Sequence, residues 1–261
     1  MLDYGLTEEQ LAIRDLAKSI ADQELRPVAA EYDVSAEFPW PVVKVIADAD
    51  LFGVFIPDEY GGIAGDARTM NMVLVTEELS KACGGIALAF AGSALGAIPI
   101  ILSGNEEQKQ RWLPDVAAGK RLCAFALTEP QAGSDAGGIR ATALRDGDHY
   151  VMNGTKQWIT NGGDAEIYSV IALTDPAKGP RGASAFVVEK GTPGFTFGKK
   201  EDKMGVRAST TRELHFEDCR VQAENLLGRE GTGFITAMKT FDASLPGVGA
   251  QDLGIAQGAL D

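Results

Sequence analysis

The spacing of apolar residues changes twice along this chain of 261 residues, and the two changes limit what it can fold into. Up to about residue 120, apolar residues recur at helical spacing, as at Ala12, Leu16 and Ile20, which predicts amphipathic helices. From residue 122 the pattern is that of short strands bounded by Gly, Pro or Asp, and near Phe234 the helical pattern returns. We therefore expect an α+β fold with an N-terminal helical domain (1–120), a middle β-barrel-like domain (121–230) and the start of a C-terminal helical bundle (231–261).

Cap and turn signals place several elements. Thr7 and Asn105 each begin a capping box, which predicts a helix after each of them. Further helices are expected over 41–51, 68–81 and 86–102, and the glycines that interrupt the last one favour a buried helix over a membrane span. Strands are expected over 122–128, 167–173, 184–188 and 211–216, with a hairpin at Asp146-Gly147 and a second turn at Asn153-Gly154.

The charge balance argues against a nucleic-acid partner. The chain holds 24 Lys and Arg against 37 Asp and Glu, a net charge of −13, whereas nucleic-acid binding depends on cations that neutralise phosphates. Its three cysteines, Cys83, Cys123 and Cys219, lie far apart without a CxxC pair, which predicts neither a disulfide framework nor a metal site. The acidic N-terminal residues do not predict a secretory signal, so we expect a bacterial cytoplasmic protein, or a mitochondrial matrix protein in a eukaryote.

Two segments carry the strongest chemical signal. Residues 128–135 read TEPQAGSD, where Gly133 lets the backbone approach a ligand closely and successive N–H groups with the Ser134 hydroxyl could hold a phosphate. A plain surface turn is the alternative interpretation. Residues 157–162 read QWITNG and place an aromatic side chain and a hydroxyl after a predicted strand, although a Trp in such a place usually packs in the core.

Together, these segments resemble the acyl-CoA dehydrogenase family. The resemblance extends over 52–62 (FGVFIPDEYGG), 104–114, 125–135, 153–162 (NGTKQWITNG), 203–207 (KMGVR) and 224–228 (ENLLG), and thus over nearly the whole chain. It implies FAD as the cofactor, an acyl-CoA substrate, an electron-transfer flavoprotein as the electron acceptor, and a homodimer or homotetramer. The implied reaction is α,β-dehydrogenation, in which a carboxylate removes the α-proton and a hydride leaves the β-carbon for the flavin.

The resemblance also implies the site residues. Those expected at FAD are Phe125, Leu127, Thr128, Gly133, Ser134, Trp158, Ile159 and Thr160, with Gly133 and Ser134 at the pyrophosphate and Thr160 near flavin N5. Ser134, Asp242, Ser244 and Leu245 are expected at the substrate. Ala91 lies where the family shapes its acyl pocket, and with Gly92 and Ser93 it leaves room there or simply packs a helix.

The last predicted helix departs from the family's pattern. The usual catalytic Glu would lie beyond Asp261, and the alternative base position holds Ser244, which cannot serve, so we expect no catalytic base within residues 1–261 and no activity from these residues alone. The family's Asp-x-x-Arg reads Asp242-Ala-Ser-Leu245 here, so the arginine that helps to hold CoA is absent. Asp252 replaces a small apolar residue and is expected to face solvent or an interface.

Two alternative functions remain open. One is a relative on the same fold that uses oxygen, such as an acyl-CoA oxidase or a flavin monooxygenase. The other is a catalytically silent subunit that binds FAD or CoA and completes a site with another chain, which the missing base and Leu245 favour.

Overall fold

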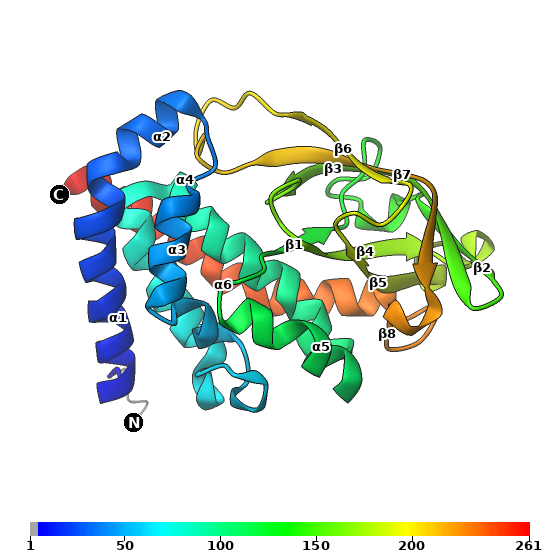
Figure 1. Ribbon diagram of the computed structural model, residues 1–261, viewed down its shortest axis with the longest axis horizontal. Helices are drawn as coiled ribbons and strands as arrows, with labels where there is room; N and C mark the ends of the chain where they lie inside the picture. Colours follow the sequence, from blue (N-terminus) through cyan, green and yellow to red (C-terminus); the bar gives the residue numbers. More distant parts are fainter. Residues whose placement is uncertain (1–4) are drawn as a thin grey trace.

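The computed structural model describes residues 5–261, with helices gathered at one end of the molecule and strands at the other (Figure 1). The first five helices are α1 (Glu8–Ile20), α2 (Ala29–Ser35), α3 (Trp40–Asp48), α4 (Arg68–Ser103) and α5 (Glu106–Ala117). A π-helical turn (Ala21–Leu25) follows α1, and 3₁₀ turns span Arg26–Val28, Leu51–Phe55, Asp58–Tyr60, Gly65–Ala67, Ala136–Gly138, Pro176–Gly182 and Ala223–Asn225. Both predicted capping boxes are confirmed, because the side chains of Thr7 and Asn105 accept hydrogen bonds from the N–H groups of Gln10 and Gln108.

Helix α4 joins two segments that the sequence predicts as separate helices. Its backbone is extended at Cys83 (φ −161°, ψ 108°), which bends the helix there. The Gln251 side chain donates to the Gly84 carbonyl at 3.1 Å, so a polar group released by the bend is satisfied. By length and composition alone, α4 could cross a membrane, but 78% of its apolar window is buried inside the protein. The prediction of a buried helix is therefore confirmed.

Eight strands form one mixed sheet. They are β1 (Cys123–Ala126), β2 (Thr142–Asp146), β3 (His149–Thr160), β4 (Ile167–Leu173), β5 (Ala183–Glu189), β6 (Phe195–Lys200), β7 (Thr211–Gln222) and β8 (Leu226–Leu227). The order is β6-β7-β3-β2-β4-β5-β8, with β1 paired beside β4. The pairs β1–β4 and β2–β4 are parallel and the others are antiparallel. The predicted β character of the middle of the chain is confirmed.

One predicted turn is a hairpin and the other is a bulge. The hairpin predicted at Asp146-Gly147 does join β2 to β3, with Gly147 (φ 64°) and Asp148 between the strands. The turn predicted at Asn153-Gly154 is wrong, because both residues lie inside β3, where the register against β7 shifts. Gly154 has φ 141°, and a Cβ there would lie 2.6 Å from the Ala141 Cβ. Glycine in this strand thus marks a bulge and a close approach rather than a chain reversal.

Helix α6 (Gly233–Leu260) runs from the sheet back along α4 toward the helical end (Figure 1). Two glycines bring it close to α4. A Cβ at Gly254 would lie 2.3 Å from the Glu77 carbonyl oxygen, and one at Gly258 would lie 2.1 Å from that of Lys81. The two helices therefore meet with backbone against backbone.

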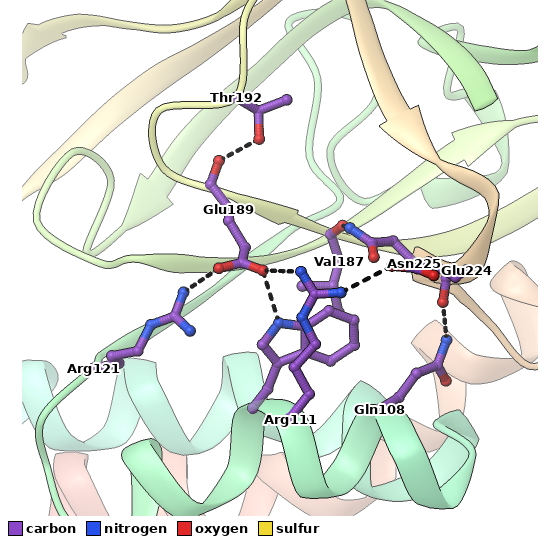
Figure 2. Close-up of polar contacts among 9 residues, drawn as sticks. Gln108, Arg111, Arg121, Val187, Glu189, Thr192, Glu224 and Asn225 are labelled. Atoms are coloured by element: carbon purple, nitrogen blue, oxygen red, sulfur yellow. Dashed lines mark hydrogen bonds and ion pairs between the residues drawn. The ribbon is translucent and has the colours of Figure 1, made fainter. Parts of the chain in front are cut away.

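A polar cluster around Glu189 fastens α5 to the end of β5 (Figure 2). The Glu189 carboxylate accepts hydrogen bonds from Arg111 at 2.9 Å, Trp112 Nε1 at 3.0 Å and Arg121 at 2.6 Å. Burial acts to raise the pKa of Glu189, but these donors outweigh it and hold the pKa below its ordinary value. The Gln108 amide also donates to the backbone carbonyls of Glu224, in the connection from β7 to β8, and of Leu226 in β8. The helical layer is thereby held in a fixed position against the sheet.

Candidate functional site

The two segments singled out from the sequence lie side by side. Residues 128–135 follow β1, and residues 157–162 cover the end of β3 and the turn after it. The Gln157 N–H donates to the Thr128 carbonyl at 2.8 Å, which joins the segments through their backbones. The 21 intervening residues (136–156), which include β2 and most of β3, thus fold away and leave the two motifs in contact.

A groove of about 600 Å³ lies between residues 127–137 and the start of α6. Leu127, Thr128, Gly133 and Ser134 line one wall, and Phe241 lies on the other. A Cβ built on Gly133 would meet no heavy atom within 4 Å, and Gly133 does not have a positive φ. Neither packing nor backbone geometry therefore demands glycine there, and the open space leaves the backbone at Gly133 accessible.

Phe125 packs against Phe241, one of the residues that line this groove. It is buried in β1, and its ring meets that of Phe241 edge-on, with centroids 5.8 Å apart and an interplanar angle of 87°. This geometry is favourable for aromatic pairs. The contact fixes the distance between β1 and α6, and hence the width of the groove.

A second, smaller cavity of about 80 Å³ lies between α6 and α4, and both halves of α4 contribute to its lining. Thr160 reaches it from the last position of β3 and Ser244 from α6. Ala91, Met72 and Leu95 line it from α4. Its lining is mainly apolar. Thr160 thus connects the end of β3 with a pocket suited to a short apolar group.

Trp158 and Asn161 both adopt the left-handed backbone conformation, with φ 57° and 60°. The Trp158 side chain is 60% exposed, so the expectation that such a residue packs in the core is wrong here. Asn161 is buried, and its Nδ2 donates to the Ala89 carbonyl at 3.2 Å, to Ser93 Oγ at 3.3 Å and to the Cys123 carbonyl at 3.2 Å. Asn161 therefore ties the turn to α4 and β1, a role that the sequence reasoning missed.

The three small residues expected to shape the acyl pocket have different roles. Ala91 and Gly92 line the small cavity, but Ser93 does not. A Cβ on Gly92 would lie 2.9 Å from both Thr160 Cγ2 and Asn161 Nδ2, so glycine is what allows α4 to approach the turn. Ser93 is buried and donates to the Ala89 carbonyl at 2.8 Å. Room in the cavity comes from Ala91, and the other two residues serve packing.

The predicted substrate residues of α6 are spread around the helix. Ser244 is buried at the small cavity, and its hydroxyl donates to the Phe241 carbonyl at 3.4 Å. Asp242 is exposed, Leu245 is 59% exposed, and neither lines the small cavity. Asp252 is exposed too, in agreement with the expectation that it faces solvent.

A buried ion pair joins the two motifs, and sequence reasoning missed it. Lys156 is fully buried, with Nζ 2.6 Å from Glu129 Oε1 and 3.0 Å from the Leu127 carbonyl oxygen. Glu129 also accepts from the N–H groups of Arg140 at 2.7 Å and Ala141 at 3.1 Å. Burial acts to raise the pKa of Glu129, but Lys156 and these N–H groups outweigh it and lower the pKa. Burial lowers the pKa of Lys156 to about 8, against the opposing effect of Glu129.

Two family models match this chain. The model described as acyl-CoA dehydrogenase, N-terminal domain, matches residues 7–120, and the one described as acyl-CoA dehydrogenase, middle domain, matches residues 124–219. The short-chain specific acyl-CoA dehydrogenase of Clostridium acetobutylicum is 46% identical over 262 residues, which cover 100% of this chain and 68% of that relative.

Solved structures agree with these matches. A chain in the structure of the electron transferring flavoprotein of Acidaminococcus fermentans is 46% identical with a TM-score of 0.96, covering 99% of this chain and 68% of that one. Butyryl-CoA dehydrogenase from Megasphaera elsdenii is 42% identical with a TM-score of 0.95, again over 99% of this chain and 68% of the other. The chain thus spans about two thirds of the length of the relatives that it matches.

Proposed function

Because the chain belongs to the acyl-CoA dehydrogenase family, we propose that it binds FAD and takes part in the α,β-dehydrogenation of an acyl-CoA thioester. The observation that carries this proposal is the meeting of the two motifs beside α6. One groove runs along residues 127–137, and a small apolar cavity opens at Thr160. A long cofactor and a short acyl group require one extended space and one small apolar space of this kind.

The residues around the groove fit FAD. The open space at Gly133 suits close approach of a pyrophosphate, and the exposed Ser134 hydroxyl is available to it as a donor. Trp158, held exposed beside the groove-lining segment by its left-handed backbone, suits a flat ring system. We assign Phe125, Leu127, Thr128, Gly133, Ser134, Trp158, Ile159 and Thr160 to the cofactor.

When bound, FAD accepts the hydride that leaves the substrate's β-carbon. The protein's own part is to orient and to exclude water. Phe125, which is 8% exposed, packs on the groove-lining Phe241, and Ile159 is 3% exposed. A water-poor site strengthens the hydrogen bonds that stabilise a developing enolate. Thr160, the last residue of β3, lines the acyl cavity, and we assign it to positioning the β-carbon.

We assign Ser134, Asp242, Ser244 and Leu245 to the acyl-CoA substrate. Ser244 borders the cavity that receives the acyl chain. Asp242 and Asp252 are exposed and lie outside the lining of that cavity, so we assign neither as the base that removes the α-proton.

We infer that the acyl chain is short. The cavity volume is about 80 Å³, roughly half that of an apolar cavity of about 150 Å³ that holds benzene, so it suits about three carbons beyond the carbonyl. The description of the Clostridium acetobutylicum relative as short-chain specific supports the same size.

We further propose the protein's partners and organisation. An electron-transfer flavoprotein accepts the electrons, the protein assembles as a homodimer or homotetramer, and it works in the bacterial cytoplasm or the mitochondrial matrix. We divide the chain into domains at 120/121 and 230/231. The step from α5 to β1 and the start of α6 at Gly233 support these boundaries.

The test is an anaerobic titration of the FAD-loaded protein, made with a chain of its relatives' full length because no base is assigned within residues 1–261. Butyryl-CoA is expected to bleach the flavin absorbance, octanoyl-CoA to do so far more slowly, and an electron-transfer flavoprotein to restore it. Rapid restoration by air instead would favour the oxygen-using alternative. Binding of FAD and CoA without any bleaching would favour the catalytically silent subunit.

A further inference from the structure

Lys156 is a fully buried cation to which the proposed reaction assigns no role. A buried charge persists when it is paired and hydrogen-bonded, and Glu129 at 2.6 Å provides that pairing. A second bond, from Lys156 Nζ to the Leu127 carbonyl oxygen at 3.0 Å, satisfies another of the three ammonium donors. It also places the cation directly against the main chain.

That carbonyl belongs to a peptide group on the wall of the groove. The Leu127 C=O and the Thr128 N–H are the two ends of one conjugated unit, and both residues line the groove of about 600 Å³. A cation bonded to the oxygen draws electron density from the nitrogen and makes the N–H a stronger donor. The charge of Lys156 thus reaches the groove although its side chain lies buried behind the wall.

The position of this peptide is also fixed from the other side. The next carbonyl, that of Thr128, accepts the Gln157 N–H at 2.8 Å. Glu129 is held by the Arg140 and Ala141 N–H groups, so it keeps the ammonium in place. Neither the peptide nor the cation can move away from the other without breaking several buried hydrogen bonds.

We propose that Lys156 is a positioning residue that raises the reduction potential of the bound flavin by polarising the Leu127–Thr128 peptide. The inference rests on the proposed function, because it requires FAD in this groove. Reduction brings two electrons onto the flavin ring, and a strengthened N–H donor at the groove stabilises the reduced form.

The test is the reduction potential of the FAD-loaded protein, measured by spectroelectrochemistry for wild type, Lys156→Met and the double variant Lys156→Met with Glu129→Gln. The double variant avoids an unpaired buried carboxylate, which could prevent the single variant from folding. In both, we expect the ratio of reduced to oxidised flavin at a fixed potential to fall about 10-fold, equivalent to about 30 mV for two electrons. Lys190→Met is the matched control, because the exposed Lys190 also donates to a backbone carbonyl, that of Gly163 at 2.6 Å, and is expected to leave the potential unchanged.

The outcomes separate the inference from the function on which it rests. If the folded variants hold FAD at an unchanged or more positive potential, the inference is overturned and the proposed function stands. If wild type binds no FAD, both are overturned. Melting temperatures recorded in parallel expose a merely structural role, which would lower them without moving the potential.

Discussion

The backbone N–H of Gln157 donates to the carbonyl oxygen of Thr128 at 2.8 Å. This bond holds residues 157–162 beside residues 128–135. The residues that follow Gln157 are thereby presented beside those that follow Thr128. Trp158 is exposed next to this bond, and Thr160 opens into the small cavity. The predictions below test what this arrangement binds and what it contributes to stability.

Replacing Trp158 and Thr160 together by alanine is expected to weaken FAD binding about 10- to 100-fold, through loss of an aromatic contact and a hydrogen bond. The flavin absorbance spectrum should shift as well. Fluorescence titration of the apoprotein with FAD measures both effects. Trp40→Ala is the control, since Trp40 is 44% exposed and packs on Phe38 in the helical layer. Unchanged FAD affinity and spectrum in the double variant would remove these two residues from the site.

In a protein of its relatives' full length, Leu245→Arg is expected to tighten acyl-CoA binding or to speed turnover. Leu245 is 59% exposed and follows the exposed Asp242 by three residues on α6, so a guanidinium there can reach an anionic ligand. A charge-assisted contact of roughly 1.5–3 kcal/mol corresponds to about 10- to 100-fold in affinity. Calorimetric titration measures the affinity for acyl-CoA, and steady-state kinetics measure the turnover. Leu253→Arg is the control, because Leu253 is 56% exposed on the same helix. A fall in both quantities would instead indicate a pocket reshaped for a bulkier, less polar ligand.

Thr76→Val is expected to stabilise the protein. Thr76 is fully buried beside the small cavity, and its hydroxyl has no hydrogen-bond partner among residues 5–261. Removing an unsatisfied buried hydroxyl should raise the free energy of unfolding by about 1 kcal/mol. Thr240→Val is the matched control, because the equally buried Thr240 donates to the Thr236 carbonyl at 2.8 Å and its loss should be neutral or destabilising. Urea denaturation without ligand gives both values, and equal changes would refute the argument.

Because Glu129 is paired with Lys156, the free energy of unfolding should fall as the pH is lowered into the acid range. The pKa of Glu129 is lowered from 4.5 in the folded protein, so below that value the unfolded chain binds more protons than the native one. The contribution is complete above the unfolded pKa of 4.5 and is lost as the pH falls through the lower native pKa. Denaturation midpoints at a series of pH values should fall more steeply for wild type than for Glu129→Gln with Lys156→Met. The exposed Glu217→Gln variant is expected to follow wild type, and identical slopes for the double variant would contradict the prediction.

The sequence predicted correctly those elements that depend on contacts between residues close together in the chain. The boxes at Thr7 and Asn105 predict two helix starts because their hydrogen bonds span three residues, and Asp146-Gly147 predicts a hairpin for the same reason. The sequence also identifies the two motifs that meet through the bond between Gln157 and Thr128. Asn153-Gly154 misleads because a turn and a bulge require the same backbone freedom from glycine, and only the partner strand β7 distinguishes them.

The errors at the site come from contacts between distant residues. Lys156 lies in a strand where a charged side chain predicts exposure, and its burial depends on Glu129, 27 positions away. Asn161 looks like an ordinary turn residue until α4 and β1 supply its three acceptors. Trp158 carries the usual prediction of core packing, which its left-handed backbone overrides. The spacing of residues within one segment cannot predict these contacts, because they form between segments far apart in the chain.

The close approach of α4 to β1 has a consequence for cooperativity. A Cβ on Gly96 would lie 2.5 Å from the Ala124 nitrogen, and Ser169 Oγ donates to the Gly96 carbonyl at 2.7 Å. No side chain of Gly96 separates the helix from the strand, so the layers cannot slide apart without exposing main-chain groups of both. A family boundary drawn near residue 120 therefore marks a change of architecture but not a unit of unfolding, since α4 is at once the centre of the helical layer and a wall of the sheet's core.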